Sequence, residues 1–147
     1  MAVRLPTVLL CFAIALTPRP EPDHAQGRTP DRVRGVSLPP TDTLSTLSAG
    51  GSTTCLTTTA GAAYCWGENA FGELGNGTTN TTSNPTPVAV SGGLAFVTIA
   101  VGQQAACAAT ADGTIYCWGR NNFGQVGQGT TTAFYTTPQR VSGVSLK

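Results

Sequence analysis

The sequence predicts an all-β fold made of two copies of one four-stranded unit. A glycine-rich block that begins at Cys65 returns, with all four of its glycines in place, as a block that begins at Cys117. The same 52-residue offset relates Cys55 to Cys107. A fixed period near 50 residues indicates a repeat architecture in which each repeat is one supersecondary unit. Short apolar or β-branched runs broken by glycine and proline, with no helical period of useful length, favour strands.

We expect four short strands in each repeat. In the first repeat the runs lie at 44–49, 53–58, 62–66 and 87–91, and in the second at 96–101, 105–110, 114–118 and 139–142. The domain boundaries that follow are 44–96 for the first repeat and 97–147 for the second.

The segment before the repeats is typical of an exported protein. Arg4 followed by about 12 mostly apolar residues suits a secretory signal, because a membrane-spanning helix takes about 20. We therefore expect a signal peptide at 1–17, with a lipid anchor on Cys11 as the alternative. Residues 18–43 are rich in proline and poor in apolar groups, which predicts a disordered linker.

The turn between two predicted strands decides how the cysteines of the second repeat pair. Asp112-Gly113 is a strong turn signal. A two-residue turn would place Cys107 opposite Trp118, whereas a three-residue loop ending at Gly113 places Cys107 opposite Cys117. A three-residue loop ending at Gly61 gives the same pairing, Cys55 opposite Cys65, in the first repeat, and we therefore prefer it.

Opposed cysteines on neighbouring strands suit disulfide geometry. Their Cα atoms lie about 4.5–5.5 Å apart, within the range that a disulfide spans. We expect the bridges Cys55–Cys65 and Cys107–Cys117, and hence a secreted or periplasmic protein. Zinc binding is the alternative, but in structural zinc sites only two to four residues lie between paired cysteines. No metal ligand set is therefore predicted.

Composition and residue types argue against several function classes. Charged residues are 10% of the chain and the formal net charge is +1, so no basic stripe for nucleic acid is expected, nor any membrane contact beyond the signal. The single histidine, His24, lies in the predicted linker. No acid–base pair or activated nucleophile is apparent, and we expect no catalytic residues, no enzyme activity and no cofactor. Glu68 and Glu73 are expected to be solvated, and Asp112 to serve its turn.

The block after each tryptophan is interpreted as scaffold. Its glycines suit backbone with positive φ or close chain approach. A phosphate cradle is the alternative, but the block lacks the Lys-Ser/Thr ending and the following helix. We expect Trp66 and Trp118 to be buried and equivalent. The apolar plugs of the two blocks are expected to be Phe71, Leu74, Phe123 and Val126.

With these motifs the chain resembles the regulator of chromosome condensation family over roughly residues 44 to 147. The family run W-G-x-N-x-x-G-x-L-G-x-G is matched at Trp66, Gly67, Asn69, Gly72 and Gly75, and again at Trp118, Gly119, Asn121, Gly124 and Gly127. The paired cysteines resemble the secreted bacterial branch. The resemblance implies a β-propeller, a ring of about seven blades in this family. This chain carries two, which predicts an incomplete propeller and a fragment of a longer product.

Function is expected to lie in long loops, here 77–87 and 129–138. Phe134 and Tyr135 are the candidate binding residues, because the repeat does not explain them and exposed aromatics are good interface anchors. We expect a non-enzymatic module that binds a protein partner, with self-association or further repeats completing the ring. The alternatives are an exchange factor for guanine nucleotides, as the resemblance implies, and a carbohydrate-binding module that uses Tyr135 or the tryptophans.

Overall fold

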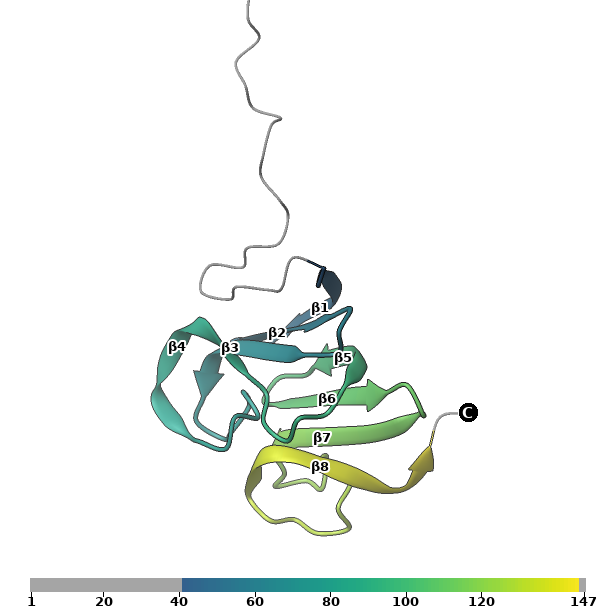
Figure 1. The fold of residues 1–147 in the computed structure, drawn as a ribbon. Coiled ribbons are helices and arrows are strands. Elements are labelled where there is room, and N and C mark those ends of the chain that lie inside the picture. The colour runs from purple at the N-terminus through teal and green to yellow at the C-terminus, as the bar shows by residue number, and fades with distance from the viewer. Residues whose placement is uncertain (1–40, 146–147) are drawn as a thin grey trace, which may run out of the picture.

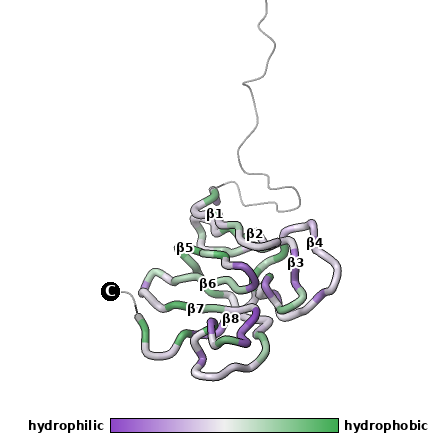
Figure 2. Tube along the Cα trace, turned by 180° about the vertical axis from the view of Figure 1, so that it is seen from behind, coloured by the Kyte–Doolittle hydropathy of each residue, from purple (hydrophilic) through white to green (hydrophobic). Residues whose placement is uncertain are grey.

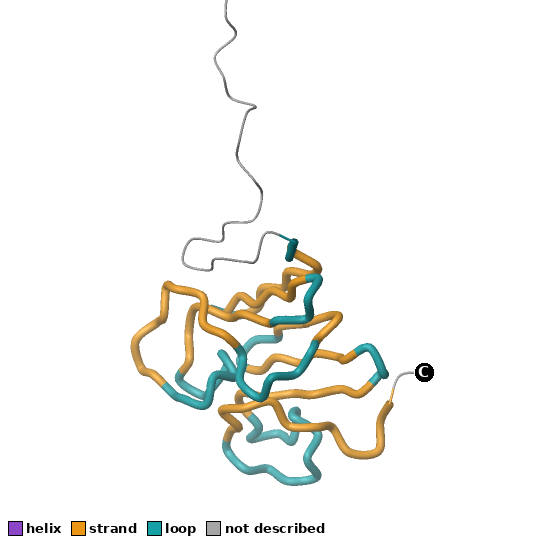
Figure 3. Tube along the Cα trace, viewed as in Figure 1, coloured by secondary structure: helices purple, strands orange, loops and turns teal. Residues whose placement is uncertain are grey.

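The computed structural model describes residues 41–145, which form two four-stranded antiparallel sheets and no helix (Figures 1 and 3). The strand order is β1-β2-β3-β4 in the first sheet and β5-β6-β7-β8 in the second, so each sheet is one sequence repeat. The predicted signal, Cys11, His24 and the linker up to residue 40 lie outside the described residues. The strands are β1 Leu44–Gly50, β2 Thr53–Thr58, β3 Ala63–Asn69, β4 Asn80–Ala89, β5 Phe96–Val101, β6 Ala105–Thr110, β7 Thr114–Arg120 and β8 Phe134–Ser145.

The central hairpin of each sheet has the register that a three-residue loop requires. Cys55 lies opposite Cys65 and Cys107 opposite Cys117, and each pair forms a disulfide with Cα atoms 4.1 Å apart. The last loop residue is a glycine with positive φ in both hairpins, 87° at Gly61 and 81° at Gly113. A residue with a Cβ would be strained there, so glycine fixes the loop and the loop fixes the pairing.

We expect peptide mapping of the oxidised chain, digested without reduction, to recover the two cross-links within sheets. The physical reason is that strand register brings each cysteine to its partner inside one hairpin, so either bridge forms without help from the other sheet. A cross-link between Cys55 and Cys107, or four free thiols in exported material, would contradict the observed register.

The fourth strand of each sheet is longer than the sequence analysis predicted. β4 begins at Asn80 and β8 at Phe134, so the loop prediction for 77–87 is wrong from residue 80 onward and that for 129–138 is wrong from residue 134 onward. Both are edge strands that pair with a single neighbour, and an edge strand tolerates Pro85 and Pro87 because the missing N–H faces away from the ladder. Figure 2 shows β4 hydrophilic over most of its length, which hid the strand from a hydrophobic pattern.

The core lies between the two sheets. β5 packs against β1 and β2, and the hydroxyl oxygen of Ser48 in β1 accepts the Val101 backbone N–H at 2.9 Å. Gly50 is needed at this junction, since a Cβ there would lie 2.4 Å from the Val101 carbonyl oxygen. The buried core residues from the two sheets are Cys55, Ala63, Cys65, Leu74, Phe96, Ile99, Ala106, Ala108 and Trp118.

Candidate functional site

Two glycine-rich loops, 70–79 after β3 and 121–133 after β7, form one end of each sheet, which we call the glycine-loop end. The asparagine of each repeat motif holds its loop from inside. Asn69 donates from Nδ2 to the Thr78 carbonyl at 3.0 Å and accepts the Leu74 N–H at 3.0 Å. Asn121 makes the equivalent bonds to Thr130 and Val126, both at 2.9 Å. Buried amides satisfied in this way fix the loop as scaffold.

The tryptophan of the second repeat completes the loop of the first. The Trp118 indole is fully buried and its Nε1–H donates to the Glu73 carbonyl at 2.8 Å. It lies directly on Gly75, where a Cβ would be 2.7 Å from Nε1. The close approach and the positive φ of 64° both require glycine at this position.

Trp66 is only half-buried, so the prediction that the two tryptophans are buried and equivalent is wrong for Trp66. The site that holds Trp118 is built by the loop of the preceding repeat. Among residues 41–145 no preceding sheet covers Trp66. Equivalent sequence positions therefore have different surroundings.

Glu73 is buried, and the prediction that it is solvated is wrong. Its side chain is 1% exposed, and Oε2 accepts the Phe71 N–H at 2.8 Å. Oε1 has no hydrogen-bond partner among the described residues. Burial raises the pKa of this carboxyl, although Arg120 nearby acts in the opposite direction. Gln125, the equivalent residue in the second repeat, accepts the Phe123 N–H at 2.9 Å with a neutral amide.

We expect Glu73→Gln to stabilise the fold at pH 7 by about 1 kcal/mol, because the amide keeps the bond to Phe71 without a buried charge. A carboxyl whose pKa is raised in the folded state lowers the stability of the fold, and this effect is complete above the folded-state pKa. The effect disappears as pH falls towards the pKa of the unfolded state. The advantage of the variant should therefore shrink from pH 7 to pH 4 in urea unfolding.

The matched control for this substitution is the reverse exchange in the second repeat. Gln125→Glu should change stability little at either pH, because Gln125 is exposed. Loss of stability in Glu73→Gln at pH 7 would show instead that attraction between Glu73 and Arg120 outweighs the cost of burial.

Aromatic side chains gather where the first glycine-rich loop meets β7 and β8. The Phe71 ring meets the Phe134 ring edge-on at a centroid distance of 6.4 Å, and the Arg120 guanidinium lies 4.9 Å from the Phe71 centroid. Arg120 also donates to the Gln104 side-chain carbonyl. Phe134 is 39% exposed and opens β8, so it lies on an edge strand rather than on the predicted loop.

Phe123 is 86% exposed, and its prediction as an apolar plug is wrong. Its counterpart Phe71 is covered by Arg120 and Phe134 of the following repeat, and no described sheet follows the second repeat. Leu74 and Val126, the other predicted plugs, are both fully buried.

Tyr135 is half-buried rather than free. Its hydroxyl lies 3.0 Å from Thr130 Oγ1, and this hydrogen bond lowers the pKa of the Tyr135 hydroxyl. Asp112 is used by its turn, as predicted: it accepts the Thr114 N–H at 3.2 Å, and the Thr110 hydroxyl holds the pKa of its carboxyl below the ordinary value.

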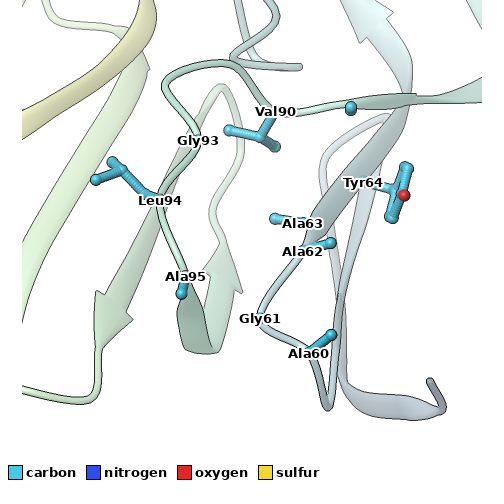
Figure 4. Close-up of a pocket in the computed structure, with 10 residues that line it drawn as sticks. Ala60, Gly61, Ala62, Ala63, Tyr64, Val90, Gly93, Leu94 and Ala95 are labelled. Carbon is cyan, nitrogen blue, oxygen red and sulfur yellow. The ribbon is translucent and has the colours of Figure 1, made fainter. Parts of the chain in front are cut away.

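A hollow at the opposite end of the first sheet offers little chemistry. Figure 4 shows it between the β2–β3 loop and the chain that leads to β5. Tyr64 is its only polar side chain, and it has no charged residue. The lining residues are Ala60, Gly61, Ala62, Ala63, Tyr64, Ala89, Val90, Gly93, Leu94 and Ala95. Within residues 41–145 no group of three or more His, Cys, Asp or Glu side chains is placed to hold a metal ion, and no helix there is long and apolar enough to cross a membrane.

Repeated four-stranded sheets, in which the glycine loop of the first repeat receives the tryptophan of the second, define a β-propeller repeat protein. The chain belongs to the regulator of chromosome condensation (RCC1) repeat family. One family model for this repeat matches residues 45–73 and 96–125, and a second matches 60–109 and 112–147. The fold and the family are therefore as the sequence motifs predicted.

Several curated proteins are similar to part of this chain. A Caenorhabditis elegans homolog of X-linked retinitis pigmentosa GTPase regulator is 35% identical over 81 residues, 55% of this chain and 6% of that protein. The zebrafish (Danio rerio) protein RCC2 homolog is 36% identical over 84 residues, 57% of this chain and 17% of that protein. The ultraviolet-B receptor UVR8 of Arabidopsis thaliana is 34% identical over 87 residues, 57% of this chain and 20% of that protein. The chain thus matches a small share of these relatives' own length.

Solved structures show the same fold. Prp20p of Saccharomyces cerevisiae superposes with a TM-score of 0.63 at 20% identity, over 72% of this chain and 27% of that one. Human WBSCR16 superposes with a TM-score of 0.61 at 24% identity, over 69% of this chain and 26% of that one.

Proposed function

We propose that this chain is a non-enzymatic binding module, secreted or periplasmic, whose glycine-loop end binds a protein partner. The observation that carries the proposal is the exposure of Phe123, 86%, beside a loop that Asn121 holds rigid. A large apolar ring on a fixed loop binds with little ordering cost, and aromatic residues and arginine are enriched at the centres of interfaces. Phe134 and Arg120 lie against Phe71 of the first loop, and Phe134 and Tyr135 begin β8.

The polar groups at the glycine-loop end support binding over catalysis. Asn69 and Asn121 are engaged by backbone groups, and Glu73 accepts a backbone N–H from a buried position. The side chains that chemistry would need are thus used in holding the loops. Among similar structures, Prp20p is described with binding properties to Gsp1p and histones, and also as bound by Kap60, which supports a protein partner.

The two alternatives have weaker support. The name of the nematode relative, a GTPase regulator homolog, supports the exchange factor, but a cytoplasmic GTPase would not meet an exported, disulfide-bonded chain. The carbohydrate module would need accessible rings. Trp118 is fully buried and the Tyr135 hydroxyl is bonded to Thr130, so of the three candidate rings only the half-buried Trp66 keeps an unengaged polar group within residues 41–145.

The experiment compares the immobilised full chain with Phe123→Ser as bait for the exported proteins of its source cells. A partner protein should be retained by the parent chain and by Thr79→Ala, an exposed control on the other loop. Phe123→Ser should reduce retention at least about tenfold, a loss of about 1.4 kcal/mol. Equal retention by all three, calorimetric binding of an oligosaccharide, or accelerated nucleotide release from a GTPase would overturn the proposal.

A further inference from the structure

The contact between the two sheets has two different sides. In the second sheet it is formed by Phe96, Ile99 and Trp118, and in the first by Leu74, Gly75 and Val90. We call these the tryptophan face and the loop face. Because the repeats are equivalent, the first sheet also has a tryptophan face, Leu44, Leu47 and Trp66, and the second also has a loop face, Val126, Gly127 and Val141.

The tryptophan face of the first sheet is open. Leu47 is 59% exposed, whereas Ile99, its equivalent in the covered face, is 5% exposed. Leu44 is 51% exposed and its equivalent Phe96 is 1% exposed. Two large apolar side chains beside a half-buried indole make a contiguous apolar surface, and a surface of that kind marks an interaction site.

The loop face of the second sheet shares backbone features with the loop face that holds Trp118. Gly127 has the positive φ of its counterpart Gly75, 77° against 64°. The backbone N–H of Ser142 reaches the Gly127 carbonyl as that of Ser91 reaches Gly75. Val141, the counterpart of Val90, is half-buried and lies over Gly127, where a Cβ would be 2.9 Å from its Cγ1. The Val141 side chain must turn away for an indole to bind there.

Hydrogen-bonding groups on the two open faces are complementary, and no like charges oppose there. The backbone carbonyl of Glu73 accepts the Trp118 indole N–H. Its counterpart, the backbone carbonyl of Gln125, has no hydrogen-bond partner among residues 41–145. The Trp66 indole N–H is likewise without one in that range. Superposing one repeat contact on the other brings Glu68, the equivalent of Arg120, to Gln125, so a carboxylate meets a neutral amide and no like charges oppose.

We propose that copies of this chain associate head to tail, with the Trp66 face of one copy seated on the Gly127 face of the next. The partner is a second copy because the chain already contains this kind of contact. The tryptophan face of its second sheet packs on the loop face of its first. Such an interface is heterologous, so repeated addition closes a ring or continues as a filament. The same superposition brings the next copy beside Phe123, because its counterpart Phe71 is covered by Arg120 and Phe134 of the following repeat. Leu47 and Val141, which the second test varies, lie outside the proposed partner surface.

The first test is sedimentation of the full chain over about a hundredfold range of concentration, since mass action governs association. The mean mass should rise with concentration, and Trp66→Ala should weaken association at least about tenfold. Acrylamide quenching of Trp66 should fall as the mass rises. A parent chain that stays monomeric throughout would overturn the proposal.

The second test uses the two-sidedness of the contact. Leu47→Glu blocks the tryptophan face and Val141→Glu blocks the loop face, so each variant alone should be monomeric. An equimolar mixture should form a dimer, because one intact face remains on each partner. Val97→Glu, at an exposed position outside both faces, is the control and should associate like the parent.

Near-UV circular dichroism checks that each variant is folded, and the milder pair Leu47→Ser and Val141→Ser replaces any that is not. Monomers in the mixture, or single variants that assemble like the parent chain, would overturn the head-to-tail contact. A two-fold symmetric dimer would appear as loss of association in one variant only, and would overturn it as well.

Discussion

Trp118→Ala is expected to destabilise the fold by about 3–5 kcal/mol, the usual range for removing a fully buried indole. The substitution leaves a cavity between the two sheets and removes the bond from Nε1 to the Glu73 carbonyl. Chemical unfolding followed by far-UV circular dichroism, at a concentration low enough to keep the chain monomeric, measures the loss. The marginal stability of small domains makes a change of this size close to unfolding the chain outright.

Trp66→Ala is the matched control, because it changes the same residue at the same position of the repeat. The half-buried indole should contribute about 1–2 kcal/mol by the area it removes from water. Equal losses in the two variants would contradict the different burial of the two tryptophans. They would show that other residues of the monomer cover Trp66.

Asn69→Ala is expected to destabilise by about 2 kcal/mol, because the buried Leu74 N–H loses its acceptor. Asn121→Ala should have a similar effect through the buried Val126 N–H. Unlike the tryptophans, both asparagines bond only within their own loop, so the two repeats should respond alike. The same unfolding experiment measures both.

Asn76→Ala is the control for a side chain that also bonds its own backbone but is not buried. Its Oδ1 accepts the Thr78 N–H and hydroxyl in an exposed turn. We expect a change within about 0.5 kcal/mol. A loss as large as that of Asn69→Ala would mean that local turn bonding, not burial, sets the cost.

The strands joined by tight turns were predictable from the sequence. Asp112 and Gly113 indicate a turn, and comparison with the first repeat selects the three-residue loop that aligns Cys107 with Cys117. Turn chemistry is local, and a register error would move every side chain of the strand to the wrong face.

The fourth strands and the asymmetry between repeats were not predictable in the same way. β4 has few apolar residues and two prolines, and it becomes a strand through pairing with β3 rather than through its own pattern. Whether Trp66, Phe123 or Glu73 is covered depends on which sheet lies beside it. The residue types at equivalent positions of two repeats do not show which sheet lies beside each position.

The disulfides have a mechanical consequence for a chain that is pulled from its ends. After a pulling force has separated β1 from β2 and β4 from β3, the disulfide carries the force from Cys55 to Cys65. The hairpin tip between these two cysteines is then under no force. The cysteines are 10 residues apart, and their bridge withholds about 30 Å of extension in each repeat. Reduction would release that slack. The thiol state of the surroundings therefore sets how far this protein lengthens under force.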